Sequence, residues 1–204
     1  MKIGCCIGLP YYDALVRNGY ESIALAAKDV AAWDEQTFEA AKAKLEAGPL
    51  ARISLNSFCT PELRLNGAGY SPKKLEAYMQ ALTARAEKLG YRYIGIGAPQ
   101  SRNVPEGGDR RRALDEMREA FEILCDAAAP HGIDVLMESV CGVECNLITT
   151  TREAAAFIGR VGRPNLHLVY DIYHEFMEGQ SVEVIGEVAD EIRVVHVAQD
   201  VNHG

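Results

Sequence analysis

Seven short apolar runs alternate along the chain with amphipathic stretches, and this alternation limits the possible fold more than any other feature. The runs occupy residues 2–7, 22–26, 52–58, 91–96, 133–138, 167–171 and 192–198. Most are near-continuous in apolar residues, as parallel strands covered on both faces should be. Strands that alternate with helices form βαβ units, so the sequence predicts a parallel sheet with helices packed on it.

The ends of the helical stretches carry clear signals. Ser71 followed by Pro72 is typical of a helix start, and the helical spacing of apolar residues continues from there until Gly90. Thr150 and Glu153 form a capping box before the helix that precedes the sixth apolar run. These signals place helices between the predicted strands.

Seven such units fit either an open doubly wound sheet or a (β/α)₈ barrel. A dinucleotide-binding sheet requires G-x-G-x-x-G after its first strand, and "GCCIGLP" does not supply it. We therefore predict one α/β domain over residues 1–204, a (β/α)₈-type TIM barrel. This barrel would be incomplete at its C-terminal end, because the sequence stops directly after the seventh strand and an eighth is lacking.

Charge and composition exclude several classes of function. A net charge of −8 and a pI near 5.2 argue against a nucleic-acid partner, which requires a basic surface. The one dense basic cluster, residues 110–112, opens a helix and is more typical of a solvated face than of a phosphate site. No apolar run reaches the length of a membrane span or a signal peptide, so we expect a cytoplasmic protein with no membrane partner. The six cysteines are expected to be free thiols.

Polar residues follow three consecutive predicted strands at the points where they end. The fifth strand ends with Glu138, the sixth ends with Asp171, and the seventh contains His196. Their separations of 33 and 25 residues are each about one βα unit. Catalytic groups of parallel barrels lie at this end of the strands, so we expect the three side chains to meet on one rim.

Two carboxylates and an imidazole suit one divalent cation, such as Mn²⁺, Mg²⁺, Co²⁺ or Zn²⁺. Without a cation, facing carboxylates would repel and one would take up a proton. The alternative is structural, with Glu138 and Asp171 satisfied by loop amides and His196 in the core. Glu144, in the loop after the fifth strand, and His174, just beyond Asp171, are both within reach of a substrate hydroxyl.

Four stretches of the sequence carry a resemblance to a known family. "GIDVLMESVCGVECNLITTTREAAAFI", "NLHLVYDIYHEFMEG", "IRVVHVAQ" and "GIGAPQSRNVPEG" resemble the xylose isomerase-like barrel superfamily. This sugar phosphate isomerase/epimerase group includes ketose 3-epimerases, hydroxypyruvate isomerase and inosose dehydratase. The resemblance covers nearly the whole chain, and it is specific for the superfamily but not for the substrate.

The resemblance implies roles for individual residues. It makes Glu138, Asp171 and His196 metal ligands, and Glu144 and His174 contacts for the hydroxyl and carbonyl oxygens of a small carbohydrate. Family members usually have an eighth strand that ends in a glutamate, which is the fourth ligand and a second acid/base. This sequence ends before such a strand and glutamate, which implies a truncated chain, a barrel closed by another subunit, or a lost activity.

Such a site favours proton abstraction next to a carbonyl, with an enediolate stabilised by the cation. Glu138 or Glu144 would be the base and His174 the acid. Epimerisation needs a base on each face of the substrate, whereas isomerisation or dehydration does not. The further candidates for substrate contact are Asn56, Arg102 and Asn202, each on an expected rim loop.

Two other functions remain open at this stage. A non-catalytic or partner-completed barrel would bind a sugar without turnover, and the exposed edges of its first and seventh strands would favour a homodimer. A metal-dependent endonuclease-like hydrolase is less favoured, since five histidines and an acidic pI do not suit a multi-zinc nuclease.

Overall fold

The computed structural model describes residues 1–198, which form one curled, seven-stranded parallel sheet. The strands are hydrogen-bonded in sequence order, so each is the neighbour of the strands before and after it. Their bounds are β1 Gly4–Cys6, β2 Ser22–Ala26, β3 Ala51–Asn56, β4 Tyr93–Ile96, β5 Asp134–Glu138, β6 Leu166–Asp171 and β7 Ile192–His196. This confirms the predicted strand order and the barrel-type architecture with seven strands among the described residues.

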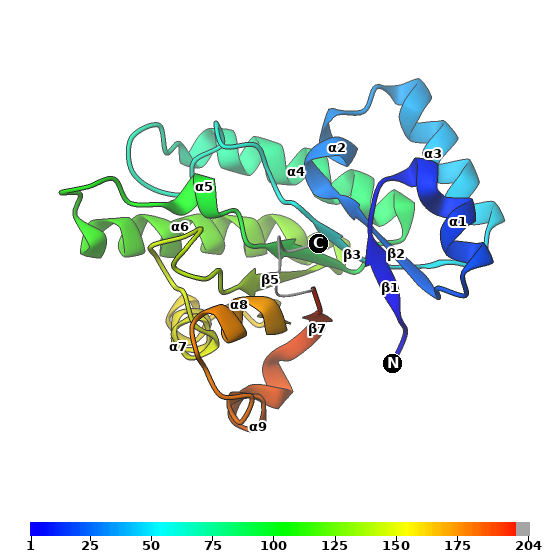
Figure 1. Cartoon of the computed structure of the whole chain (residues 1–204). Helices are drawn as coiled ribbons and strands as arrows, with labels where there is room; N and C mark the ends of the chain where they lie inside the picture. Colours follow the sequence, from blue (N-terminus) through cyan, green and yellow to red (C-terminus); the bar gives the residue numbers. More distant parts are fainter. Residues whose placement is uncertain (199–204) are drawn as a thin grey trace.

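Helices connect the strands and pack on the outside of the sheet, where α4 lies between α2 and α6, and α6 lies next to α7 (Figure 1). The α-helices are α1 Tyr12–Arg17, α2 Ala27–Ala32, α3 Glu35–Ala47, α4 Pro72–Leu89, α5 Pro99–Arg102, α6 Arg110–Ala128, α7 Thr151–Val161, α8 Ile172–Met177 and α9 Val184–Val188. Short 3-10 turns are η1 Leu9–Tyr11, η2 Ala129–His131 and η3 Ala189–Glu191. No helix in residues 1–198 combines the length and the apolar character needed to cross a bilayer.

The predicted helix signals act as expected. The Ser71 side chain accepts a hydrogen bond from the Lys74 amide at the start of α4, and Gly90 ends that helix with a φ of 79°. Thr150 caps α7 by accepting from the Glu153 amide, whereas the Glu153 carboxylate accepts from the Thr149 amide (2.7 Å), one residue before the position that the capping box predicts. These two helices therefore begin, and α4 also ends, where the local capping residues dictate.

One hydrophobic core holds the sheet and the outer helices together. Strand residues such as Ile94 and Val135 are fully buried against helix residues such as Met117 and Phe121. The Phe121 and Phe157 rings of α6 and α7 meet edge to face, with centroids 5.3 Å apart. This packing leaves the carboxyl ends of the strands and their loops to form the candidate site.

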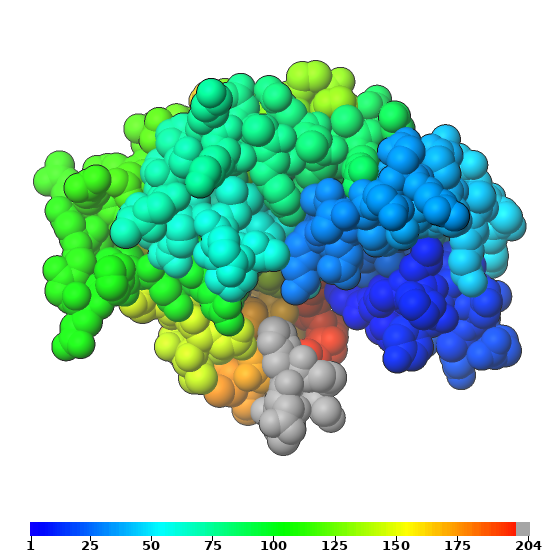
Figure 2. Space-filling view, turned by 90° about the horizontal axis from the view of Figure 1, so that it is seen from above, coloured from blue at the N-terminus to red at the C-terminus, as the bar shows by residue number. Residues whose placement is uncertain are grey.

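The first and last strands each have one edge that pairs with no other strand among the described residues. Figure 2 shows the blue N-terminal region and the red region around β7 as neighbours on one side of the molecule. Apolar side chains are exposed near both edges, including Ile3 and Val195. The expected homodimer stays a prediction.

Candidate metal centre and active site

Sheet register brings three side chains from β5, β6 and β7 to the same place. Asp171 and His196 are direct partners in the parallel pairing of β6 with β7. Glu138 pairs with Val169, two residues before Asp171, and residues two apart on a strand lie on the same face. The register therefore places all three side chains on one face of the sheet, at the carboxyl ends of their strands.

The three side chains converge closely enough to share one ion. The His196 Nδ1 atom lies 2.7 Å from Glu138 Oε1 and 3.7 Å from Asp171 Oδ2. One ligand atom from each residue falls within 4.8 Å of the others. We call these residues the acid–histidine cluster. Its donor set of two carboxylates and one imidazole suits a divalent cation of the Mg²⁺ to Zn²⁺ series.

Asp171 has two structural tasks, one for each carboxylate oxygen. Its Oδ1 atom caps α8 by accepting hydrogen bonds from the amides of Tyr173 (2.8 Å) and His174 (3.3 Å). Its Oδ2 atom is the one that faces His196. The aspartate that ends the strand thus also begins the helix, and in doing so it fixes the position of His174 relative to the cluster.

The electrostatics of the cluster favour charged side chains. Burial alone would raise the pKa of Glu138, but the hydrogen bond and charge of His196 and the charge of His174 outweigh it, so the pKa lies below its usual range. Burial would lower the pKa of His196, yet hydrogen bonding to Cys6 and Glu138, with the charges of both groups, raises it to about 10. A cation bound at this imidazole would have to replace a proton.

Glycines at the end of β4 leave room for the cluster. A Cβ atom added at Gly97 would lie only 2.4 Å from Glu138 Oε2, so the carboxylate would have to move. A Cβ atom at Gly95 would similarly lie 2.8 Å from Asn56 Oδ1. The sequence "GIG" therefore provides the space in which Glu138 turns toward His196.

The space at Gly97 yields a test of the cluster's function in metal binding. Gly97→Ala should push the Glu138 carboxylate away from His196 and weaken Mn²⁺ binding by about tenfold or more, measured by calorimetric titration. Gly159→Ala is the matched control, because a methyl group there meets no atom within 4 Å. Equal Mn²⁺ affinity in the two variants would contradict the assignment.

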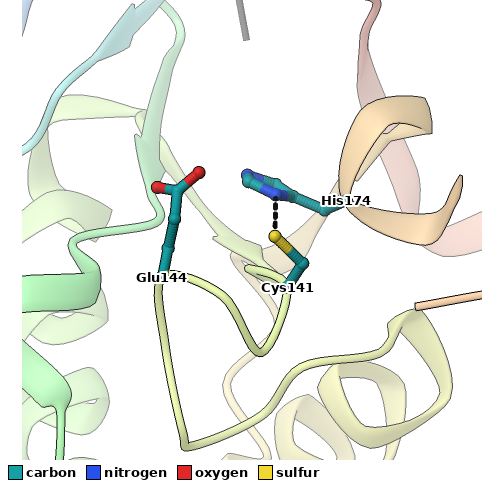
Figure 3. A group of neighbouring side chains, drawn as sticks. All are labelled: Cys141, Glu144 and His174. Carbon is teal, nitrogen blue, oxygen red and sulfur yellow. Dashed lines mark hydrogen bonds between the residues drawn. The ribbon is translucent and has the colours of Figure 1, made fainter. Parts of the chain in front are cut away.

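A second group of side chains lies in the loop after β5 and on α8 (Figure 3). The His174 Nδ1 atom is 3.4 Å from the Cys141 sulfur, and the Glu144 carboxylate is turned toward the histidine ring. Cys141 and His174 are buried, whereas Glu144 is exposed. We call these residues the thiol cluster. Burial raises the pKa of the Cys141 thiol.

Reciprocal hydrogen bonds between two loops hold Glu144 in place. The Asn103 amide group donates to the Glu144 carbonyl (2.9 Å) and accepts from the Asn146 amide (2.8 Å). Asn146 in turn accepts from the Val104 amide (2.9 Å) and donates to the Val104 carbonyl (2.7 Å). The segment after β4 therefore positions the loop that carries Cys141 and Glu144.

Arg102 was expected to face the substrate, but the structure places it inside the protein. Its side chain is fully buried and donates to the carbonyls of Glu138 (3.0 Å) and Ile148 (3.3 Å), and to the Cys145 sulfur (3.1 Å). These bonds tie the start and the end of the loop after β5 together. Arg102 is thus a positioning residue for this loop, and a charged residue in a loop gave no sequence signal of that burial.

Removal of this buried guanidinium should destabilise the fold. Arg102→Met removes the buried donor that links the Glu138 carbonyl, the Cys145 sulfur and the Ile148 carbonyl, so we expect the free energy of unfolding to fall by roughly 3 kcal/mol in urea denaturation. Arg160→Met, at an exposed position of α7, should change it by less than about 0.5 kcal/mol. Similar stabilities of the two variants would show that Arg102 does not hold the loop.

The other candidate residues have mixed outcomes. Asn56 ends β3, where its Nδ2 atom donates to Cys6 (3.0 Å) and its buried Oδ1 atom has no hydrogen-bond partner among residues 1–198. Asn202 lies outside the described residues. His131 and His167 pair with Glu87 (2.7 Å) and Glu191 (3.1 Å) near the starts of β5 and β6, away from both clusters.

Sequence reasoning missed the contributions of Cys6 and Cys141. Cys6 lies beside His196 and Asn56, and Cys141 contacts His174. Both follow or end a strand at the same rim, so the rule that found Glu138 could have found them. All six cysteines are free thiols, as predicted.

Comparison with known proteins agrees with this architecture. The chain belongs to the xylose isomerase-like TIM barrel family, whose model matches residues 12–204. It is 26% identical to a ketose 3-epimerase of Arthrobacter globiformis over 98% of this chain and 72% of that protein. It is 32% identical to a putative hydroxypyruvate isomerase of Mus musculus, over 68% of this chain but only 53% of the relative.

Solved structures show the same fold. A D-psicose 3-epimerase from Clostridium cellulolyticum H10, crystallised with D-tagatose, superposes with a TM-score of 0.86 at 19% identity. The superposition covers 98% of this chain and 73% of the epimerase chain. The IOLI protein, solved with a zinc atom, superposes with a TM-score of 0.74 at 16% identity over 97% and 72% of the two chains.

Proposed function

We propose that this protein is a divalent-metal-dependent isomerase or epimerase of small sugars or related keto-polyols. The observation that carries the proposal is the acid–histidine cluster, in which Glu138 and Asp171 approach the same His196 nitrogen to 2.7 and 3.7 Å. Family membership and the names of the relatives support an isomerase or epimerase. The zinc atom in one structural neighbour supports a metal.

The acid–histidine cluster would hold the cation. Its three ligand atoms lie within 4.8 Å of one another. Two carboxylates at such a short distance repel each other, and a cation between them would offset that repulsion. A bound divalent cation would polarise the substrate's carbonyl and a neighbouring hydroxyl, and so favour the enediolate.

Glu138 is the proposed base. Because its pKa is held low, the carboxylate is ionised near neutral pH and able to accept a proton from the carbon beside the substrate carbonyl. Return of that proton to the neighbouring carbon gives isomerisation. Epimerisation requires instead that a second acid, on the other face of the enediolate, delivers a proton to the same carbon, while Glu138 keeps the one it removed. Dehydration would begin with the same proton abstraction and continue with loss of a neighbouring hydroxyl group as water.

His174 and Glu144 are the proposed contacts for substrate oxygens. Burial raises the pKa of the Cys141 thiol, and its sulfur lies 3.4 Å from the His174 Nδ1 atom. With the thiol as donor in this contact, a neutral His174 ring would carry its proton on Nε2. An Nε2–H group is a donor for a carbonyl or hydroxyl oxygen. The exposed Glu144 carboxylate would accept from a substrate hydroxyl or act as a second base.

A ketose with a hydroxyl beside the carbonyl is the proposed substrate class, as the names of the relatives suggest. We would incubate the Mn²⁺-loaded protein in D₂O with D-fructose, D-psicose, D-tagatose and hydroxypyruvate. Deuterium entering the carbon next to the carbonyl, observed by NMR, reports proton abstraction directly. We expect exchange with at least one member of this panel.

Glu138→Gln should slow this exchange by about a hundredfold or more, while circular dichroism shows an unchanged fold. The matched control is Glu191→Gln, since Glu191 also pairs with a histidine, His167, but at the far end of the sheet. Exchange that persists unchanged in Glu138→Gln would rule out Glu138 as the base. A panel without any exchange would reject the proposed substrate class.

A further inference from the structure

The thiol cluster has the composition of a second cation site. Cys141, Glu144 and His174 each offer one ligand atom, and these atoms lie within 4.8 Å of one another. The set shares no residue with the acid–histidine cluster. We propose that the thiol cluster binds a borderline-soft divalent ion, Zn²⁺ or Co²⁺, separately from the ion at Glu138.

The sulfur-to-nitrogen distance fits this assignment. With metal–sulfur and metal–nitrogen bonds of about 2.3 and 2.05 Å, tetrahedral coordination places the two ligand atoms about 3.6 Å apart. The observed separation of Cys141 Sγ and His174 Nδ1 is 3.4 Å. Little movement is therefore needed for an ion to replace the thiol proton, which would pass to solvent.

The protein holds these three residues in position before any ion binds. The amides of Glu144 and Cys145 both donate to the Cys141 carbonyl at 2.9 Å, and this turn brings residues 141 and 144 to the same side of the loop. Asp171 fixes the start of α8 and thus His174. In Figure 3 the Glu144 carboxylate is turned toward the cysteine–histidine pair.

Ligand type separates the two sites. The acid–histidine cluster offers oxygen and nitrogen, which Mg²⁺ and Mn²⁺ accept, whereas a thiolate selects Zn²⁺ and Co²⁺. Three protein ligands with Glu144 on the exposed side leave a fourth position open to water or to a substrate oxygen. The two sites should therefore be distinguishable by metal preference.

A consequence follows for regulation, and it rests on the proposed function. His174 and Glu144 are the proposed contacts for substrate oxygens, so an ion that takes both side chains removes them from the substrate. Zn²⁺ in excess of the first site would then inhibit competitively, whereas excess Mn²⁺ would not. If the proposed function is wrong, the predicted inhibition has no basis, but the predicted metal site is unaffected.

The binding test requires no turnover. Metal-free, reduced protein is titrated with Co²⁺, and the near-ultraviolet absorption of cobalt–thiolate bonds is followed together with stoichiometry. The wild type should bind two equivalents, one of which gives the thiolate band. Cys141→Ser should lose the band and keep one equivalent, whereas Cys59→Ser, the control at a distant partly buried thiol, should keep both.

Two further variants separate the sites. Glu138→Gln should weaken the first site and keep the thiolate band, and Glu144→Gln, at an exposed position that folding tolerates, should weaken the band-forming site by about tenfold. The proposal is overturned if the wild type gives no thiolate band. It is also overturned if the band survives in Cys141→Ser, since the cobalt would then be bound by another thiol such as Cys6.

Discussion

The register of three neighbouring parallel strands is the constraint on which the site depends. Asp171 and His196 are paired residues, and Glu138 is paired with the residue two positions before Asp171. A shift of one residue in either pairing would turn a ligand toward the opposite face of the sheet. The apolar residues of β5 and β6 are fixed by burial in the core, so the hydrophobic pattern that builds the barrel also sets the positions of the ligands.

The loops that follow these strands are positioned by one another. Arg102 holds both ends of the loop after β5, and Asn103 holds its middle through the Glu144 carbonyl. Glu175 adds a buried link, since its carboxylate accepts from the Thr151 amide at 2.8 Å and so joins α8 to the start of α7. The side chains proposed to touch substrate are thereby held by hydrogen bonds between neighbouring loops and helices.

Much of this arrangement could be predicted from the sequence, because it depends on local patterns. The run that became β2 was predicted with its bounds intact, and β5 and β6 end at Glu138 and Asp171 as expected. What could not be predicted depends on contacts between loops distant in sequence. Arg102 ends the short helix α5, in a segment that the sequence suggested was an exposed loop, and its buried guanidinium bonds to residues of 138–148 that no local pattern reveals. The role of Gly97 likewise appears only when Glu138 turns toward it.

The central claim is that Glu138, Asp171 and His196 bind one divalent cation. Its most direct test is an anomalous difference map from crystals grown with Mn²⁺. We expect one strong peak within bonding distance of all three side chains, about 2.0–2.6 Å from their ligand atoms. A map in which the Glu138–His196 contact persists without a peak, or in which the ion binds elsewhere, would contradict the claim.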